Sequence, residues 1–225
     1  MIRIVLLAAL ALTAPFVAHA QGVLPRYPLT AEDGSPILNS KIKPDESAAV
    51  EQLPGAVVVG NPQGDVTLAE FYDLNCPFCR RASADVEQLI KSDPKLRVIL
   101  VPFPVLGVAS VLAGRVELAV AKSIPPEKFY EFHRALYAGR GTIDGQRALA
   151  LATGEFGLAA QKVVDAANDD AITETMKSHL RFADKFGLNA TPAYLIHDVA
   201  IQGHPGRKTL QSVVASVRKC AKAMC

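Results

Sequence analysis

The sequence predicts an α/β fold in which a block of helices interrupts a sheet, and three observations support this. Two apolar, β-branched runs, 66–72 and 96–101, flank a segment with helical spacing, which is the order of a parallel βαβ unit. Residues 110–186 have mainly helical periodicity and contain no convincing strand. Strand-like runs return at 193–196 and 199–201. The helical block therefore lies between two parts of one sheet.

Each element has local signals for its start or end. Residues 57–59 are three valines, which suit a first strand. The helix expected over 76–92 ends before Pro94, because a residue that precedes proline disfavours helical geometry. Gly187 is suited to end the last helix of the block. The predicted helices of the block span 110–122, 127–137, 145–153, 158–167 and 170–186, and a final amphipathic helix carries Leu210, Val213, Val214 and Val217.

The first twenty residues, 1–20, have the composition of a secretory signal peptide. Arg3 gives a short basic region, 4–12 is an apolar run too short to span a bilayer, and 18–20 form an Ala-x-Ala cleavage site. We expect the mature chain to begin at Gln21 in an oxidising compartment, for which a bacterial periplasm is the best match. An uncleaved membrane anchor is the alternative.

Residues 21–54 form a proline-rich N-terminal arm. Five prolines interrupt it, polar residues separate them, and only 45–52 has the pattern of a short helix. We expect an extended arm that packs loosely along the body or acts as a linker. An oligomerising arm is the alternative, although no heptad pattern supports it.

Composition argues against several classes of protein. Half of the 225 residues are hydrophobic, which is enough for a core without disulfide staples, and the length suits one large domain or one domain with an insertion. The formal net charge is only +2, so there is no electrostatic basis for binding nucleic acid. Beyond the leader, no run approaches the roughly eighteen consecutive apolar residues of a transmembrane helix.

The most informative motif is Cys76-Pro77-Phe78-Cys79, which joins the strand over 66–72 to the following helix. At a helix N-terminus, unpaired N–H groups and the positive end of the helix dipole stabilise a thiolate. The thiolate, and not the thiol, attacks disulfides. A C-x-x-C pair in a βαβ setting therefore indicates thiol redox chemistry.

Half of a zinc site is the alternative interpretation of this pair. A structural zinc site needs four ligands, but the other two cysteines, Cys220 and Cys225, lie at the extreme C-terminus and the histidines occur singly. We therefore favour redox chemistry and predict no metal. We expect Cys220 and Cys225 to form a small structural disulfide if the last helix breaks after about Cys220. A second redox centre is the alternative.

Two segments, 71–81 and 187–194, resemble the DsbA-type thiol:disulfide oxidoreductases of the thioredoxin superfamily. Both the C-x-x-C pair and a distant Thr-Pro before a strand match, with a helical block between them. The resemblance implies a thioredoxin-like fold with an inserted helical domain. The expected parts are a first thioredoxin-like part at 55–104, the helical insertion at 105–186, and a second thioredoxin-like part with the C-terminal cysteine pair at 187–225.

The resemblance also assigns roles to single residues. Cys76 corresponds to the nucleophile that forms a mixed disulfide, and Cys79 to the resolving thiol. Pro192 corresponds to the cis-proline that lies against the cysteine pair, which directs the backbone of Thr191 toward an extended substrate. Pro77 and Phe78, which lie between the cysteines, are expected to tune the redox properties of the pair.

Glu70 is a further candidate, because an acid within an apolar strand is costly unless it has a partner or a function. Alternation along the strand places it on the same face as Leu68 and Tyr72. It lies six residues before the expected nucleophile and resembles the buried acid of the family. We expect it to exchange a proton with Cys79. A paired structural acid is the alternative.

Two residues depart from the pattern of many family members. Phe78 stands where many have histidine, and it offers the thiolate neither a charge nor a hydrogen-bond donor. Thr191 stands where many dedicated oxidants have valine, and threonine is common in related isomerases and reductases. Both departures put a strongly oxidising character in doubt.

The resulting expectation is an exported enzyme that exchanges disulfides with protein substrates and needs no cofactor. The preferred direction is oxidation of substrate thiols, followed by reoxidation by a quinone-linked membrane partner. The alternatives are a disulfide isomerase or reductase kept reduced by a membrane donor, and a copper(I)-binding protein that holds the metal between Cys76 and Cys79.

Overall fold

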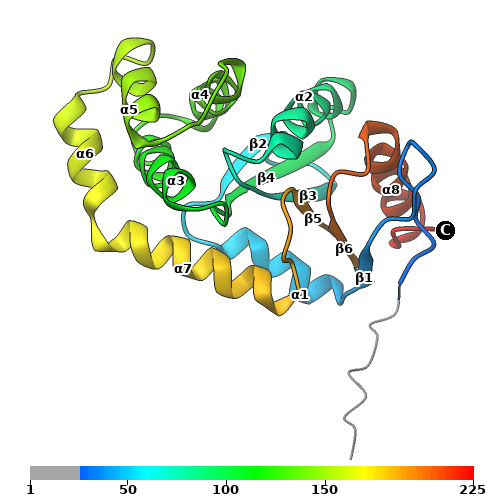
Figure 1. Ribbon diagram of the computed structural model, residues 1–225. Helices are drawn as coiled ribbons and strands as arrows, with labels where there is room; N and C mark the ends of the chain where they lie inside the picture. Colours follow the sequence, from blue (N-terminus) through cyan, green and yellow to red (C-terminus); the bar gives the residue numbers. More distant parts are fainter. Residues whose placement is uncertain (1–25) are drawn as a thin grey trace, which may run out of the picture.

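The computed structural model describes residues 26–225, so the expected leader at 1–20 lies outside the described residues (Figure 1). Its strands form a six-stranded sheet in the order β1-β6-β5-β3-β4-β2. The strands are β1 (Asn39–Lys41), β2 (Val57–Gly60), β3 (Val66–Tyr72), β4 (Leu96–Pro102), β5 (Ala193–Ile196) and β6 (Val199–Gln202). The helices are α1 (Pro44–Ala48), followed by a 3-10 turn (Ala49–Gln52), α2 (Pro77–Ser92), α3 (Val108–Ala121), α4 (Pro126–Ala138), α5 (Gly145–Gly154), α6 (Ala160–Asn168), α7 (Asp170–Lys185) and α8 (Arg207–Cys220).

The centre of the sheet is a βαβ unit. Strands β3 and β4 run parallel and are connected by α2, while β5 pairs antiparallel with the other side of β3. Helices α3 to α7 occupy the whole chain between β4 and β5. The predicted fold class, an α/β sheet interrupted by a helical insertion, is confirmed.

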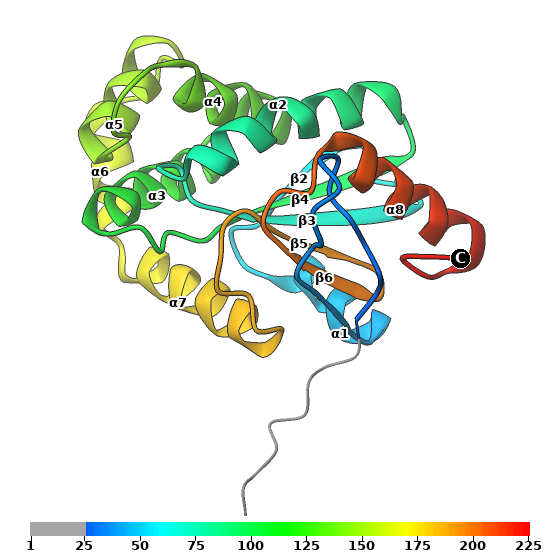
Figure 2. The same ribbon diagram turned by 45° about the vertical axis from the view of Figure 1, so that its right-hand side comes forward.

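Helices cover both faces of the sheet. In Figure 2, α2 and α8 lie above it and α1 and α7 lie below it. Alternation along β3 supplies both cores, because Leu68 and Tyr72 pack toward α2 and α8 while Phe71 packs toward α7. Helices α3 to α6 form a group beside α2, at the end of the sheet where β3 finishes (Figures 1 and 2).

The arm contains a strand that the sequence pattern does not predict. β1 is an edge strand that pairs antiparallel with β6, and its first residue, Asn39, is buried. The Asn39 side chain accepts a hydrogen bond from the backbone N–H of Tyr27 and donates to the carbonyl groups of Tyr27 and Ile37. Three residues are too few to show an apolar alternation, so β1 is specified by the edge of β6 rather than by its own sequence.

Within residues 26–225, no helix is both long enough and apolar enough to cross a lipid bilayer.

Candidate active site

The cysteine pair lies at the start of α2, directly after the loop that follows β3. Cys76 is the N-cap residue and Pro77 is the first residue of the helix. Proline suits this position because its missing N–H would have no partner within the helix. Cys79 lies on the inner face of α2 and is 1% exposed, Cys76 is 4% exposed, and the side chain between them, Phe78, is 54% exposed.

The surroundings of Cys76 stabilise its thiolate. Its pKa is lowered to about 5, first by a hydrogen bond from the Cys79 thiol and then by one from the Thr191 side chain. The backbone N–H groups of Cys79 and Phe78 lower it further, while partial burial opposes the shift. Cys76 is therefore ionised at neutral pH, as expected for an attacking thiol at a helix N-terminus.

Cys79 has the opposite character. Burial raises the pKa of its thiol well above the usual range, and the hydrogen bond to Cys76 and the charge of Glu70 raise it further. The reduced pair therefore holds a thiolate at the outer cysteine and a thiol at the inner one. This is the asymmetry that a nucleophile and a resolving thiol require.

Glu70 is buried beneath this pair, at 2% exposure. Burial raises its pKa to about 8; a hydrogen bond from Tyr194 partly offsets the shift, and the charge of Cys76 adds to it. Tyr194 lies directly opposite Glu70 in the register of β3 and β5. A carboxyl group with a pKa near neutrality can both take and give a proton, so Glu70 has the properties of a general acid and base.

Thr191 and Pro192 lie against the cysteine pair from the other side of the site. The Thr191–Pro192 peptide bond is cis, and β5 begins at the next residue. The backbone carbonyl oxygen of Thr191 lies 3.1 Å from the Cys76 sulfur, which donates a hydrogen bond to it only when the thiol is protonated. The structure thus brings together residues that are 115 positions apart in the sequence.

Phe78 contributes to the site through its backbone. Its N–H group is one of the donors that lower the pKa of Cys76. Its ring is exposed and packs against the guanidinium of Arg81, 4.5 Å from the ring centroid. The aromatic side chain is therefore available for contact with a bound molecule.

Asp73 is a site residue that the sequence analysis missed. Its buried carboxylate accepts hydrogen bonds from the N–H groups of Asn75, Val105 and Leu106 and from the hydroxyl of Ser110. Asp73 therefore anchors the loop that carries Cys76 onto the first residues of the helical insertion. The signal was an aspartate two residues before an asparagine, a typical Asx-turn position between a strand and a helix.

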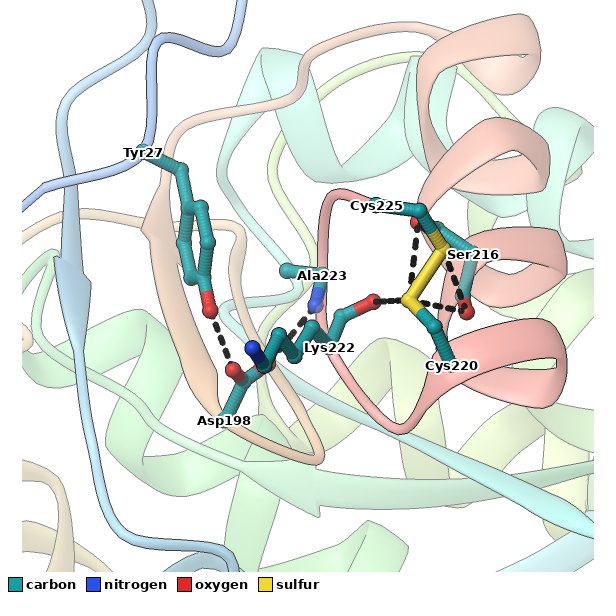
Figure 3. Close-up of a disulfide and its surroundings, with 7 residues drawn as sticks. All are labelled: Tyr27, Asp198, Ser216, Cys220, Lys222, Ala223 and Cys225. Carbon is teal, nitrogen blue, oxygen red and sulfur yellow. Dashed lines mark hydrogen bonds between the residues drawn. A yellow bond between two sulfur atoms is a disulfide. The ribbon is translucent and has the colours of Figure 1, made fainter.

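Cys220 and Cys225 form a disulfide at the far end of α8 (Figure 3). The helix ends at Cys220 because Ala221 adopts a left-handed conformation. The loop that the bond closes is tied to the β5–β6 turn, where Asp198 accepts a hydrogen bond from the Ala223 N–H at 2.8 Å. The other carboxylate oxygen of Asp198 accepts one from the hydroxyl of Tyr27 in the arm (Figure 3).

The C-terminal disulfide bears on the zinc alternative. Cysteines joined to each other cannot supply the second half of a zinc site. Across residues 26–225, no group of three or more histidine, cysteine, aspartate or glutamate side chains is arranged to hold a metal ion.

A stabilised thiolate paired with a protonated thiol, at the first β-to-α junction of a βαβ unit, defines a thiol:disulfide oxidoreductase with a thioredoxin-like fold. Comparison with known proteins supports this class. The family model described as thioredoxin matches residues 52–216. The chain belongs to the thioredoxin family, and its relatives include thiol:disulfide oxidoreductases.

Three relatives illustrate the likeness. A thioredoxin-like oxidoreductase from Silicibacter pomeroyi DSS-3 has 34% identity and a TM-score of 0.71, over 76% of this chain and 97% of that one. Disulfide bond formation protein D of Bacillus subtilis is 25% identical, over 73% of this chain and 78% of its own. A periplasmic thioredoxin-like protein from Salmonella enterica serovar Typhimurium has 27% identity and a TM-score of 0.63, over 79% of this chain and 98% of that one.

Proposed function

We propose that this enzyme is an exported oxidant that transfers the Cys76–Cys79 disulfide to thiols of extended protein substrates. The observation that carries the proposal is the stabilised thiolate at Cys76, whose pKa is about 5. Oxidising power rises as the reduced form of a dithiol is stabilised, because the disulfide then gains more by accepting two electrons.

The proposed reaction has two displacement steps. A substrate thiolate attacks the Cys76 sulfur of the oxidised enzyme, the Cys76–Cys79 bond breaks, and Cys79 takes a proton from Glu70. A second substrate thiolate then attacks the substrate sulfur of the mixed disulfide, and Cys76 leaves as a thiolate. The substrate loses two electrons and the enzyme gains them, so a disulfide moves from enzyme to substrate. The low pKa of Cys76 makes it a good leaving group in the second step.

An apolar surface beside the site suits unfolded protein substrates. Leu106 and Val108, at the start of the helical insertion, are 52% and 74% exposed, and Phe78 is exposed next to the nucleophile. Asp73 joins the two segments through its hydrogen bond to the Leu106 N–H. The carbonyl group of Thr191, next to Cys76, offers a backbone acceptor to an extended substrate segment.

The proposed location is the bacterial periplasm, and the proposed partner is a quinone-linked membrane oxidase that restores the disulfide. The leader-like residues 1–20 support export, and one relative is described as periplasmic. The second candidate is a disulfide isomerase or reductase kept reduced by a membrane donor. It is favoured by Phe78, which gives the thiolate no side-chain donor, and by Thr191 before the proline.

The reduction potential of the Cys76–Cys79 pair separates these candidates. We would equilibrate the Cys220→Ala/Cys225→Ala variant with glutathione buffers, so that only the active-site pair reacts. An oxidant should have a potential less negative than about −200 mV, whereas a value near that of thioredoxin, about −270 mV, would contradict the proposal. The oxidised protein should also form disulfides in a reduced, unfolded test protein, and a Cys76→Ser variant should not.

A further inference from the structure

A chain of polar side chains runs from beneath the cysteine pair to the protein surface. Tyr194 lies opposite Glu70 in the β3–β5 register, and a hydrogen bond from Tyr194 lowers the pKa of Glu70. The Tyr194 hydroxyl lies 2.8 Å from Nδ1 of His204. Nε2 of His204 lies 2.8 Å from a carboxylate oxygen of Asp85. The side chain of His204 is 11% exposed and that of Asp85 is 37% exposed, so the chain ends in solvent. Its members come from β3, β5, the loop before α8, and α2.

Three other tyrosines lie near Glu70. Burial raises the pKa of each, and the charge of Glu70 raises it further, but their hydroxyl groups do not connect to solvent. The hydroxyl of Tyr72 donates to Glu117, which is fully buried. The hydroxyl of Tyr137 donates to a backbone carbonyl, which does not take up a proton at neutral pH. Within residues 26–225, the buried hydroxyl of Tyr130 has no hydrogen-bond partner. Among residues 26–225, the hydrogen-bonded path from Glu70 to solvent therefore runs through Tyr194 of β5.

We propose that Tyr194, His204 and Asp85 form a proton relay between Glu70 and solvent, which resets Glu70 after each exchange with Cys79. This inference rests on the proposed function, in which Glu70 gives a proton to Cys79 and takes one from it. In the structure of residues 26–225, none of the three forms a hydrogen bond with Cys76 or Cys79, so they are positioning residues that act on Cys79 through Glu70.

The hydrogen-bond roles along the chain are consistent with this transfer. An ionised Asp85 only accepts hydrogen bonds, so Nε2 of His204 carries a hydrogen and Nδ1 accepts one from the Tyr194 hydroxyl. The Tyr194 oxygen can then accept a hydrogen bond from protonated Glu70. The need for a relay arises because Glu70 is only 2% exposed and has no direct access to water.

In the step that deprotonates Glu70, its proton moves to the Tyr194 oxygen while the proton of Tyr194 moves to Nδ1 of His204. The imidazolium that forms is stabilised by the Asp85 carboxylate and releases a proton to solvent. Tyr194 is then a hydrogen-bond donor to the Glu70 carboxylate, which is the interaction that lowers the pKa of this acid against burial. The same steps in reverse protonate Glu70 after it has given its proton to Cys79.

The titratable groups around the relay come from three sides. Glu70 faces Cys76 before α2, Cys79 of α2 and Tyr194 of β5, in addition to the tyrosines of β3 and α4 described above. Burial raises the pKa of the Tyr194 hydroxyl well above its usual value, and the charges of Glu70, Cys79 and Asp85 raise it further. Tyr194 therefore stays protonated and passes protons without accumulating as a phenolate.

The test follows the step in which Cys79 must lose its proton. Reduced protein is mixed rapidly with oxidised glutathione, and release of the second glutathione from Cys76 is followed by acid quench and mass spectrometry. The Cys220→Ala/Cys225→Ala background excludes the other cysteines. The relay variants are Tyr194→Phe, His204→Gln and Asp85→Asn. Tyr130→Phe is the matched control, because it removes a hydroxyl near Glu70 that leads nowhere.

We expect release to slow by about tenfold or more in Tyr194→Phe and His204→Gln, a part of the 10²–10⁴-fold that general acid–base catalysis contributes. Asp85→Asn should slow it less, and Tyr130→Phe should not change it. None of the relay changes should slow it further when combined with Glu70→Gln, because the relay acts through Glu70. In one further variant, His204→Gly, added imidazole should restore the rate, whereas it should not restore that of Glu70→Gln.

The outcomes separate this inference from the proposed function. If Glu70→Gln slows release but the relay variants do not, the relay is wrong and the role of Glu70 stands. If Glu70→Gln has no effect, both are wrong. If the relay variants slow release equally with and without Glu70, or if they shift the pKa of Cys76, measured by thiolate absorbance, in the Glu70→Gln background, their role is structural and the relay is refuted.

Discussion

The thiolate at Cys76 should make the reduced enzyme gain stability over the oxidised enzyme as pH rises from 5.5 to 7.5. The pKa of Cys76 is about 5 in the folded protein, against a usual value of 9.0. Between these values the unfolded reduced chain holds one proton more than the folded one, so folding stability increases with pH. The contribution is full above pH 9 and disappears as pH falls through 5.

The magnitude follows from the one additional proton that the unfolded reduced chain binds in this pH range, which sets the slope of stability against pH. Each unit is worth about 1.4 kcal/mol, so two units give about 2.7 kcal/mol. Cys79 contributes nothing in this window, because its pKa is raised and it stays protonated in both states. Glu70 titrates in both redox forms and mostly cancels in the difference. The part of the Glu70 pKa shift that comes from the Cys76 charge exists only in the reduced form, so it does not cancel. We therefore expect the difference in stability between the reduced and oxidised forms to change by about 2–3 kcal/mol from pH 5.5 to pH 7.5.

Urea unfolding followed by circular dichroism measures this quantity for both redox forms at the two pH values. The Cys220→Ala/Cys225→Ala background lets the reductant act on the active-site pair alone. In the Cys76→Ser variant there is no thiolate at this position. The difference between its stability and that of the oxidised protein should therefore not change with pH. If the difference between reduced and oxidised stability is the same at pH 5.5 and 7.5, the thiolate is not stabilised by the fold and the reasoning fails.

Four further substitutions test single side chains of the site. Asp73→Asn should destabilise the protein by roughly 2–4 kcal/mol in urea unfolding, because an amide leaves buried N–H donors unsatisfied, and Ser110→Ala should cost about 1 kcal/mol. Phe78→His should lower the pKa of Cys76 and raise the reduction potential. The thiolate should be stabilised by less than the roughly 1.5–3 kcal/mol of a full charge-assisted hydrogen bond. The reason is that residue 78 points into solvent beside Arg81. The raised pKa of Glu70 makes its ionisation costly only in the folded state, so the protein should lose about 1.4 kcal/mol of stability per pH unit between pH 4.5 and 8. Glu70→Gln should abolish this loss. An unchanged pH profile of stability in the oxidised protein would contradict the prediction.

Much of the fold could be predicted because its signals are local. The central strands are buried on both faces, so their apolar, β-branched runs are visible without any knowledge of their partners. The last helix of the insertion ends where Gly187 takes a positive φ of 64° and its N–H bonds to the Asp184 carbonyl, as its sequence position suggests. The cysteine pair and its helix were likewise recognisable from one short segment.

The features that were not predicted depend on contacts between distant segments. β1 exists because the edge of β6 accepts it, and nothing within its three residues signals a strand. The chain from Tyr194 through His204 to Asp85 joins positions up to 119 residues apart, so single scattered residues acquire a role only once the strand register is known. Asp73 was visible as a turn residue, but its bonds to the helical insertion were not.

The most direct test of the central claim is to trap the mixed disulfide. Cys79→Ser and Cys76→Ser proteins would be incubated with a protein that carries free thiols and one that carries disulfides, then quenched in acid and analysed by non-reducing gels and mass spectrometry. If Cys76 is the outer thiolate that attacks and Cys79 the inner thiol that resolves, Cys79→Ser should accumulate a covalent complex through Cys76, and Cys76→Ser should accumulate none. Equal trapping by both variants, or trapping only by Cys76→Ser, would contradict the assignment of the nucleophile and the mechanism built on it.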